Sequence, residues 1–349
     1  MRLFHNDYNM MCHPAVSAAM LDSANEQNSG YGLDNYCTAA AEKIKKLCNN
    51  DDLSMHFLVG GTQTNLTVIA ATLRPFQGVV GPVSAHINVH ETGAIEATGH
   101  KVIGLPSDDG KITAKQIENL VLEHRDCDDA EHIVQPKMVY ISDSTELGTI
   151  YKLSELESIS TVCKKYGLYL YLDGARLSYA LTAADNDVTL ADIARLTDAF
   201  YIGGTKCGAM FGEAVVISNP AIAEDFRYMI KQRGAMLAKG WLLGLQFDAL
   251  MENGLYFNIA RNANVLADRI KKTLIECGCR MVVDNSTNQV FAVMHKDILN
   301  VISKDFSYSA MEWVDEYHRV VRFCTSWATE ESEVNELCDA IRNACSIRG

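Results

Sequence analysis

The chain of 349 residues has a mass of 38.5 kDa, and this length predicts one large domain with a smaller companion. Apolar residues make up 48% and charged residues 21% of the chain, a globular composition that excludes disordered and collagen-like classes. The formal net charge of −13 at pH 7 argues against nucleic acids and anionic membranes as main partners, because such a surface repels phosphate.

Residues 1–7 soon become polar in composition and lack the apolar core of a signal peptide. No window of the sequence approaches the roughly 18 consecutive apolar residues of a transmembrane helix. The eleven cysteines are scattered through apolar or helical patterns, which indicates reduced thiols rather than a disulfide framework. We therefore expect a cytoplasmic protein.

Short apolar runs alternate with amphipathic stretches from about residue 35 to residue 230. The runs are rich in β-branched and aromatic residues, as expected of strands that are covered on both faces. The strand candidates are residues 56–59, 78–80, 101–103, 138–141, 168–172, 199–202 and 214–217. Strands that alternate with helices form βαβ units, so we predict an α/β fold with a mostly parallel sheet flanked by helices.

One of these helices carries signals at both of its ends. Ser154 and Glu157 have the spacing of a capping box, in which the hydroxyl accepts from a backbone amide and the carboxylate reaches back. Gly167 follows the apolar stripe and is suited to a left-handed helix stop.

The pattern changes after residue 230. We predict two long helices, at about 234–252 and 255–277, that are separated by Asn253 and Gly254. Short strands are expected at 280–283, 290–294 and 319–323, followed by a helix at 330–346. The expected organisation is a large α/β domain, residues 1–240, and a C-terminal part, residues 241–349, that holds linking helices and a small α+β domain.

Gly61 and Thr62 follow the first strand candidate and open a predicted helix. The backbone amides and the threonine hydroxyl at a helix N-terminus form an anion site. This pattern matches neither the Walker motif nor GxGxxG, and a tight turn with a threonine cap explains it about equally well.

Asp173 and Lys206 each stand where a buried strand ends. A carboxylate at the C-terminal end of a central strand lies where open α/β sheets bind ligands. Lys206 lies among glycines, a setting that suits an amine kept from water for reaction with a carbonyl, although a lysine reaching outward from a turn is an alternative. An anion site, a carboxylate and such an amine together fit pyridoxal 5′-phosphate.

Four motifs occur together in this order, at residues 85–94, 143–149, 173–176 and 203–206. With them the chain resembles, over nearly its whole length, the low-specificity L-threonine aldolases, which are fold type I pyridoxal-phosphate enzymes of the aspartate-aminotransferase-like class. The resemblance implies a lyase that cleaves L-threonine, L-allo-threonine and related β-hydroxy-α-amino acids by a retro-aldol reaction to glycine and an aldehyde.

The resemblance also implies roles for individual residues. Lys206 would be the Schiff-base lysine, with Thr205 beside it at the cofactor, and Asp173 would be the partner of the pyridine nitrogen. His86 would stack on the cofactor ring. Arg176 would grip the substrate carboxylate and lie near the cofactor's phenolic oxygen.

A second group of residues concerns the substrate and the subunit junction. Arg322 would also bind the substrate carboxylate, and Asn6 stands where the family commonly has a serine that touches it. Tyr31 would lie close to a subunit junction, across which Lys239 is the candidate to approach the phosphate. We therefore expect a homodimer or homotetramer with active sites at the subunit interface.

The general base stays open at this point. His90 replaces an aromatic residue that is common in the family, and Thr145 occupies the place where many members have a second histidine. The base is therefore His86, His90 or a water that they position.

Two other functions are compatible with the same residues. A β-eliminating lyase acting on cysteine- or serine-type substrates would share Lys206 and Asp173. A non-catalytic scaffold of the same fold is the second alternative, against which the intact Lys206 argues. Metal is not expected, since His124, Cys127 and His132 do not form a tetrahedral set.

Overall fold

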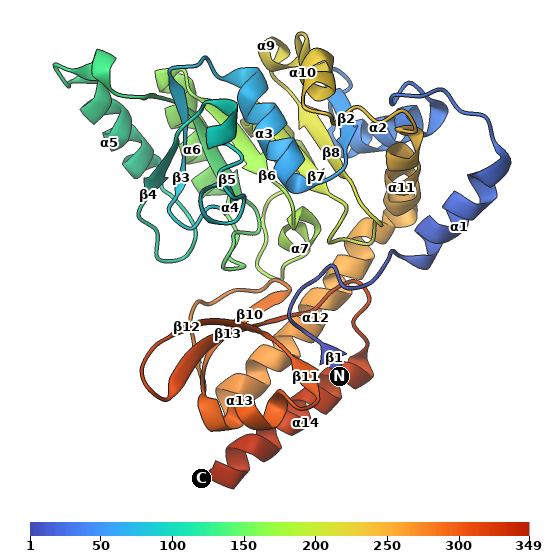
Figure 1. Ribbon diagram of the computed structural model, residues 1–349, viewed down its shortest axis with the longest axis vertical. Helices are drawn as coiled ribbons and strands as arrows, with labels where there is room; N and C mark the ends of the chain where they lie inside the picture. The colour runs from blue at the N-terminus through green and yellow to red at the C-terminus, as the bar shows by residue number, and fades with distance from the viewer. Residues whose placement is uncertain (349) are drawn as a thin grey trace.

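A seven-stranded sheet forms the centre of the upper part of the computed structural model, which describes residues 1–348 (Figure 1). Its strand order is β2-β8-β7-β6-β5-β3-β4, and all neighbours pair in parallel except β8, which is antiparallel to both β2 and β7. The strands are β2 (Ser54–Leu58), β3 (Gln77–Pro82), β4 (Val102–Leu105), β5 (Gln135–Ser142), β6 (Tyr169–Asp173), β7 (Ala199–Gly203) and β8 (Glu213–Ile217). All seven strand candidates and the predicted fold class are confirmed.

Helices cover both faces of this sheet because alternate residues of its strands point to opposite sides. Val139 and Ile141 of β5 pack into the core on one face, whereas Met138 and Tyr140 pack into the core on the other. Ile44 belongs to the first of these cores. The helices before residue 240 are α1 (Pro14–Asp22), α2 (Asn35–Cys48), α3 (Gly61–Thr72), α4 (His86–Val89), α5 (Ala114–Arg125), α6 (Leu153–Tyr166), α7 (Leu177–Leu181), α8 (Leu190–Leu196), α9 (Pro220–Ala223) and α10 (Phe226–Gln232).

The predicted start of α6 is wrong, while its predicted stop is confirmed. The helix begins at Leu153, and the carboxylate of Glu155 accepts the backbone N–H of Lys152 at 2.8 Å. The side chain of Asp187, remote in sequence, accepts the N–H of Leu153 at 2.9 Å and so stabilises the earlier start. Gly167 has a φ of 64° and ends the helix in the left-handed conformation.

The C-terminal part holds a four-stranded antiparallel sheet of order β12-β13-β10-β9. Its strands are β9 (Arg280–Met281), β10 (Gln289–His295), β12 (Ser309–Trp313) and β13 (His318–Cys324), and its helices are α11 (Trp241–Met251), α12 (Leu255–Glu276), α13 (Lys296–Ile302) and α14 (Glu331–Arg348). The predicted helix 234–252 is too long, because residues 234–240 form a turn in which Gly234 has a φ of 70°. The edge strand β12 was not predicted, because it is mostly exposed and has no clear alternating pattern.

The long helix α12 runs from the large sheet to the small one (Figure 1). Its first half contributes Tyr256 and Ala260 to the core of the large sheet, and its second half contributes Ile270 and Leu274 to the C-terminal core. The N-terminal segment also reaches the C-terminal core, where Phe4 is buried and β1 (Arg2–Leu3) pairs with β11 (Phe306–Ser307). The division at residue 240 stays a prediction. Among the described residues, every helix is too short or too polar to cross a lipid bilayer.

Candidate active site

A pocket of about 360 Å³ lies where the carboxyl ends of β5, β6 and β7 meet the N-terminus of α3. This is the edge of a parallel sheet at which α/β proteins bind ligands. The structure brings seven of the predicted site residues to this pocket: Gly61, Thr62, His86, Asp173, Arg176, Thr205 and Lys206. Five others are not among its lining residues: Asn6, Tyr31, His90, Lys239 and Arg322.

Asp173 is the last residue of β6, and its buried carboxylate accepts four hydrogen bonds. They come from the hydroxyls of Tyr140 at 2.6 Å and Tyr201 at 2.5 Å, the amide of Asn65 at 3.0 Å and the backbone N–H of Ala175 at 3.0 Å. Burial by itself would raise the pKa of Asp173, but the tyrosine hydrogen bonds outweigh it and hold the pKa below its ordinary value. The pocket therefore contains a fixed, ionised carboxylate.

Lys206 follows β7 and lines the same pocket, so it does not reach outward from the turn. Burial lowers the pKa of its ammonium, and the positive charge of Arg176 lowers it further, against the opposing charges of Asp7 and Asp173. Its backbone is held by the Tyr179 hydroxyl, which donates to the Lys206 carbonyl at 2.7 Å. A positioned amine with a lowered pKa is suited to attack a carbonyl carbon.

Glu213, the first residue of β8, holds the loop that carries Lys206. One of its carboxylate oxygens accepts the Thr205 hydroxyl at 2.9 Å, and the other accepts the Gly204 N–H at 3.1 Å. The Thr205 hydroxyl also accepts the N–H of Gly212 at 3.1 Å. Burial raises the pKa of Glu213. Glu213 was not predicted from the sequence, and the role of Thr205 at a cofactor stays a prediction.

His86 is oriented by a carboxylate that sequence analysis also missed. Its Nδ1 lies 2.8 Å from an oxygen of Glu91, whose side chain is completely buried. Asn65 donates to this same oxygen at 2.8 Å and to Asp173, and it accepts the Tyr171 hydroxyl at 2.8 Å. With Nδ1 donating to Glu91, Nε2 of His86 is left as the acceptor. The only signal in the sequence was an acidic residue five positions after the histidine.

Glu146 is, after Glu213, the second carboxylate lining the pocket that was not predicted from the sequence. Its Oε1 accepts the backbone N–H of His86 at 2.9 Å and the hydroxyl of Ser142 at 2.8 Å. Thr145, which the resemblance places where many family members have a second histidine, is buried, and its hydroxyl lies 2.7 Å from that of Thr149. The residues of this loop that line the pocket are the neighbours of Thr145 on either side, Ser144 and Glu146.

The guanidinium of Arg176 pairs with Asp7 of the N-terminal segment. Nε and Nη2 donate to the two oxygens of Asp7 at 2.7 and 3.0 Å, and Asn288 donates to Asp7 at 2.9 Å. Burial by itself would raise the pKa of Asp7, but the charges of Arg176 and Lys206 hold it below its ordinary value. Because this fork faces Asp7, the assignment of Arg176 to a substrate carboxylate stays a prediction.

Three further candidates lie on other segments. Arg322 of β13 donates through Nη1 to Gln289 at 3.0 Å and through Nη2 to the carbonyl of His5 at 3.0 Å. His90 is exposed, and its ring centroid is 5.6 Å from that of His86. Partial burial lowers the pKa of His90, with the charges of His86 and Arg322 acting in the same direction. The side chain of Asn6 accepts the backbone N–H of the residue two positions later at 3.1 Å.

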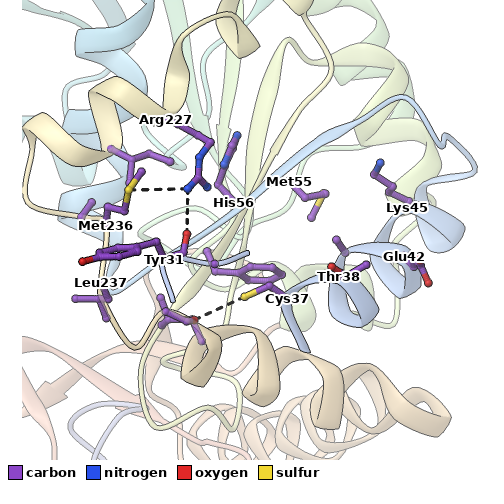
Figure 2. Close-up of a pocket in the computed structure, with 17 residues that line it drawn as sticks. Tyr31, Cys37, Thr38, Glu42, Lys45, Met55, His56, Arg227, Met236 and Leu237 are labelled. Atoms are coloured by element: carbon purple, nitrogen blue, oxygen red, sulfur yellow. Dashed lines mark hydrogen bonds between the residues drawn. The ribbon is translucent and has the colours of Figure 1, made fainter. Parts of the chain in front are cut away.

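Tyr31 lines a different cavity, of about 320 Å³, which Figure 2 shows with Arg227 on the same side as Tyr31 and Lys45 on the other. Arg227 donates to the carbonyl of Tyr31 at 3.1 Å. Burial lowers the pKa of His56 in this cavity to about 4. Lys239 is exposed in the turn before α11. The predicted positions of Tyr31 and Lys239 at a subunit junction stay predictions.

Comparisons with known proteins identify the family of the chain. The family model for beta-eliminating lyases matches residues 9–297. The low specificity L-threonine aldolase of Pseudomonas sp. is 31% identical over 346 residues, which is 98% of this chain and 97% of that protein. The low specificity L-threonine aldolase of Pseudomonas aeruginosa is 28% identical over 340 residues, which is 97% of this chain and 96% of that protein.

Solved structures extend the likeness to the fold. A Leishmania major threonine aldolase superposes with a TM-score of 0.96 at 46% identity, covering 99% of this chain and 100% of that one. A Thermus thermophilus aspartate aminotransferase mutant has a TM-score of 0.71 at 13% identity, covering 98% and 91%, and so shares the fold alone. The chain therefore belongs to the beta-eliminating lyase family, among the low-specificity L-threonine aldolases.

Proposed function

We propose that this chain is a pyridoxal-phosphate-dependent lyase that cleaves L-threonine, L-allo-threonine and related β-hydroxy-α-amino acids to glycine and an aldehyde. Family membership supports this proposal, and one observation carries it: Lys206, Asp173 and the N-terminus of α3 line a single pocket. The amine suits the aldehyde of this cofactor, the carboxylate suits its protonated ring nitrogen, and the helix N-terminus suits its phosphate.

The residues of the pocket fit the cofactor. The N-cap of α3 is Gly60, which has no side chain to cap the helix, so its first amides can serve a phosphate. A Cβ at Gly61 would lie 3.1 Å from the Tyr201 hydroxyl, so a larger residue would crowd the pocket wall at this point. The ionised Asp173 suits a protonated ring nitrogen.

When bound, pyridoxal 5′-phosphate withdraws electrons from the substrate Cα, which is the chemistry that breaking the Cα–Cβ bond requires. Lys206 would provide the amine that holds the cofactor through its aldehyde group. Asp173 would hold the ring nitrogen in its protonated form. His86 lines the pocket with Nδ1 held by Glu91, so Nε2 would be the atom that accepts or returns the β-hydroxyl proton.

Arg322 is our candidate to bind the substrate carboxylate. Within residues 1–348, its Nε is buried and has no hydrogen-bond partner, which leaves one edge of the guanidinium for an anion. Arg176 and Asn6 stay as further candidates. His90 is a secondary candidate for the general base because it is exposed beside His86.

We also propose a homodimer or homotetramer in which a neighbouring subunit completes the site. Tyr31, at the wall of the cavity in Figure 2, is 47% exposed, and Tyr228, beside this cavity, is 76% exposed. Exposed aromatic groups together with the exposed Lys239 support a surface that a partner covers. A fully active monomer in analytical ultracentrifugation would contradict this proposal.

The purified protein, with added cofactor, should release acetaldehyde and glycine from threonine. A panel of threonine, allo-threonine, serine and phenylserine, in both enantiomers, defines the substrate class. Pyruvate from serine or cysteine, without acetaldehyde from threonine, would instead establish the β-eliminating alternative.

Lys206→Ala tests the chemistry separately from the fold. We expect turnover to be lost while the circular dichroism spectrum is unchanged. Borohydride trapping followed by peptide mapping should place the label on Lys206 of the wild-type protein. Threonine cleavage by the variant, or a label on another lysine, would refute the assignment.

A further inference from the structure

Of the two carboxylate oxygens of Glu146, one accepts hydrogen bonds from the protein and the other accepts none from the described residues. Oε1 accepts two hydrogen bonds, from the backbone of His86 at 2.9 Å and from Ser142 at 2.8 Å. Oε2 is enclosed, and in the described part of the chain it has no hydrogen-bond partner. The residue lines the pocket that also holds His86 and Lys206. Both bonds end on Oε1, so neither is lost when a ligand donates to Oε2.

An enclosed carboxylate oxygen without a donor is unfavourable. Removing such a group from water without supplying a hydrogen bond destabilises the folded protein, and more so when the group is charged. The structural task of holding His86 needs only Oε1, and a glutamine would do it equally well. The cost at Oε2 is offset when a bound molecule supplies a donor.

The other carboxylates at this pocket are already occupied. Asp173 accepts four hydrogen bonds, and Glu213 uses both oxygens to hold the loop around Lys206. Glu91 lies behind His86 and is not among the lining residues. Of the acidic side chains described as lining the pocket, Glu146 is therefore the one with an oxygen left for a ligand.

The surroundings of Glu146 also make it a stronger base than an exposed glutamate. Burial raises its pKa, and the negative charge of Asp173 from β6 acts in the same direction. Hydrogen bonds from Ser142 and from the backbone of His86 on α4 oppose this rise without cancelling it. A base with a raised pKa retains a proton more firmly near neutral pH.

We propose that Oε2 of Glu146 accepts the hydrogen bond of the substrate β-hydroxyl and takes its proton as the Cα–Cβ bond breaks, so that Glu146 is the second acid–base group of the site beside His86. This proposal rests on the proposed function. The O–H bonding pair becomes the second carbon–oxygen bond of the aldehyde, and the Cα–Cβ pair stays with Cα, where it takes up a proton from solvent to give glycine. The proton on Oε2 is afterwards released to water, which restores the carboxylate.

Glu146→Gln tests this role, because the amide oxygen keeps both bonds of Oε1 while an NH2 group replaces Oε2. Loss of general acid–base catalysis should lower kcat for threonine about 100-fold or more. Glycine has no β-hydroxyl, so the rate at which the variant exchanges the α-hydrogen of glycine with solvent should stay within about twofold of the wild-type rate. Glu123→Gln, a change on the exposed face of α5, is the matched control for removing one charge.

The cofactor-free protein provides a second readout that does not depend on activity. Infrared difference spectra between wild type and Glu146→Gln should show a protonated carboxyl that persists above the ordinary glutamate pKa of about 4.3. A carboxyl that titrates in the ordinary range would show Oε2 in contact with water and would overturn the proposal.

The outcomes separate this proposal from the proposed function. If the wild-type protein cleaves no β-hydroxy amino acid, the proposed function itself is wrong. If the wild type cleaves threonine and Glu146→Gln does so at an equal rate, only the role of Glu146 is refuted. Equal losses of threonine cleavage and glycine exchange would mean that the residue acts structurally, which also overturns the proposal.

Discussion

The buried ion pair between Asp7 and Arg176 joins the first residues of the chain to the loop after β6, and it makes a quantitative prediction. The side chain of Asp7 is completely buried and that of Arg176 is 12% exposed. Asp7→Asn keeps the size of the side chain and removes its charge. The guanidinium is then left in the interior without a counter-charge.

Breaking a buried pair in this way costs about 3–5 kcal/mol of unfolding free energy, because the remaining charge has lost both water and its partner. Unfolding entropy is about 2.1 cal/mol/K per residue, so for 349 residues the same loss lowers Tm by about 4–7 °C. The pair between Arg195 and Glu157 is a matched control. Its atoms are 2.9 Å apart, but both side chains are about half exposed, so Glu157→Gln should cost less than about 1 kcal/mol.

Urea unfolding and differential scanning calorimetry of wild type and both variants, at one protein and cofactor concentration, measure these costs. The loss of unfolding free energy for Asp7→Asn should be at least three times that for Glu157→Gln. Equal losses, or a loss below about 1 kcal/mol for Asp7→Asn, would refute the view that desolvation sets the strength of this pair.

Three further predictions concern the active site and its support. The stabilisation from Asp7 should be complete above about pH 4, the ordinary aspartate pKa, and should disappear as the pH falls through the lower pKa of the folded state. The measurement is the difference in unfolding free energy between wild type and Asp7→Asn as a function of pH. Glu91→Gln removes the carboxylate that fixes the tautomer of the neighbouring histidine, so steady-state kinetics should show kcat lowered about tenfold or more without loss of thermal stability. Gly174→Ala places a methyl group against the carbonyl oxygen of Tyr201 and should cost about 1–3 kcal/mol in urea unfolding, whereas Gly60→Ala, with open space around it, should be tolerated; equal stability of these two variants would contradict the steric argument.

The strands of the large sheet could be predicted because their signal is local. A run such as residues 168–172 is apolar throughout and ends at a carboxylate, whatever the rest of the chain does. The same locality placed Asp173 and Lys206 at strand ends, and parallel strands bring such ends to one edge of the sheet. The edge strand β12 has no comparable local signal, because its residues are mostly exposed. It becomes a strand by pairing with β13, which runs antiparallel to it.

Helix ends were predicted less well where distant groups take part. The start of α6 depends on Asp187, more than 30 residues away, which accepts the N–H of Leu153. Residues 234–240 have a helical composition, but the positive φ of Gly234 turns the chain before α11 begins. Local propensity is a weak preference that tertiary contacts override.

The polar groups around the candidate site show the same division. Glycine at a helix start, a carboxylate and a lysine at strand ends were readable from the linear chain, because their chemistry follows from their place in a βαβ unit. The pairing of Asp7 with Arg176 spans 169 positions, and the choice of Glu146 rather than Thr145 depends on which way one loop residue faces. Side-chain direction and desolvation arise only when remote segments pack together, so these partners were decided by the tertiary structure alone.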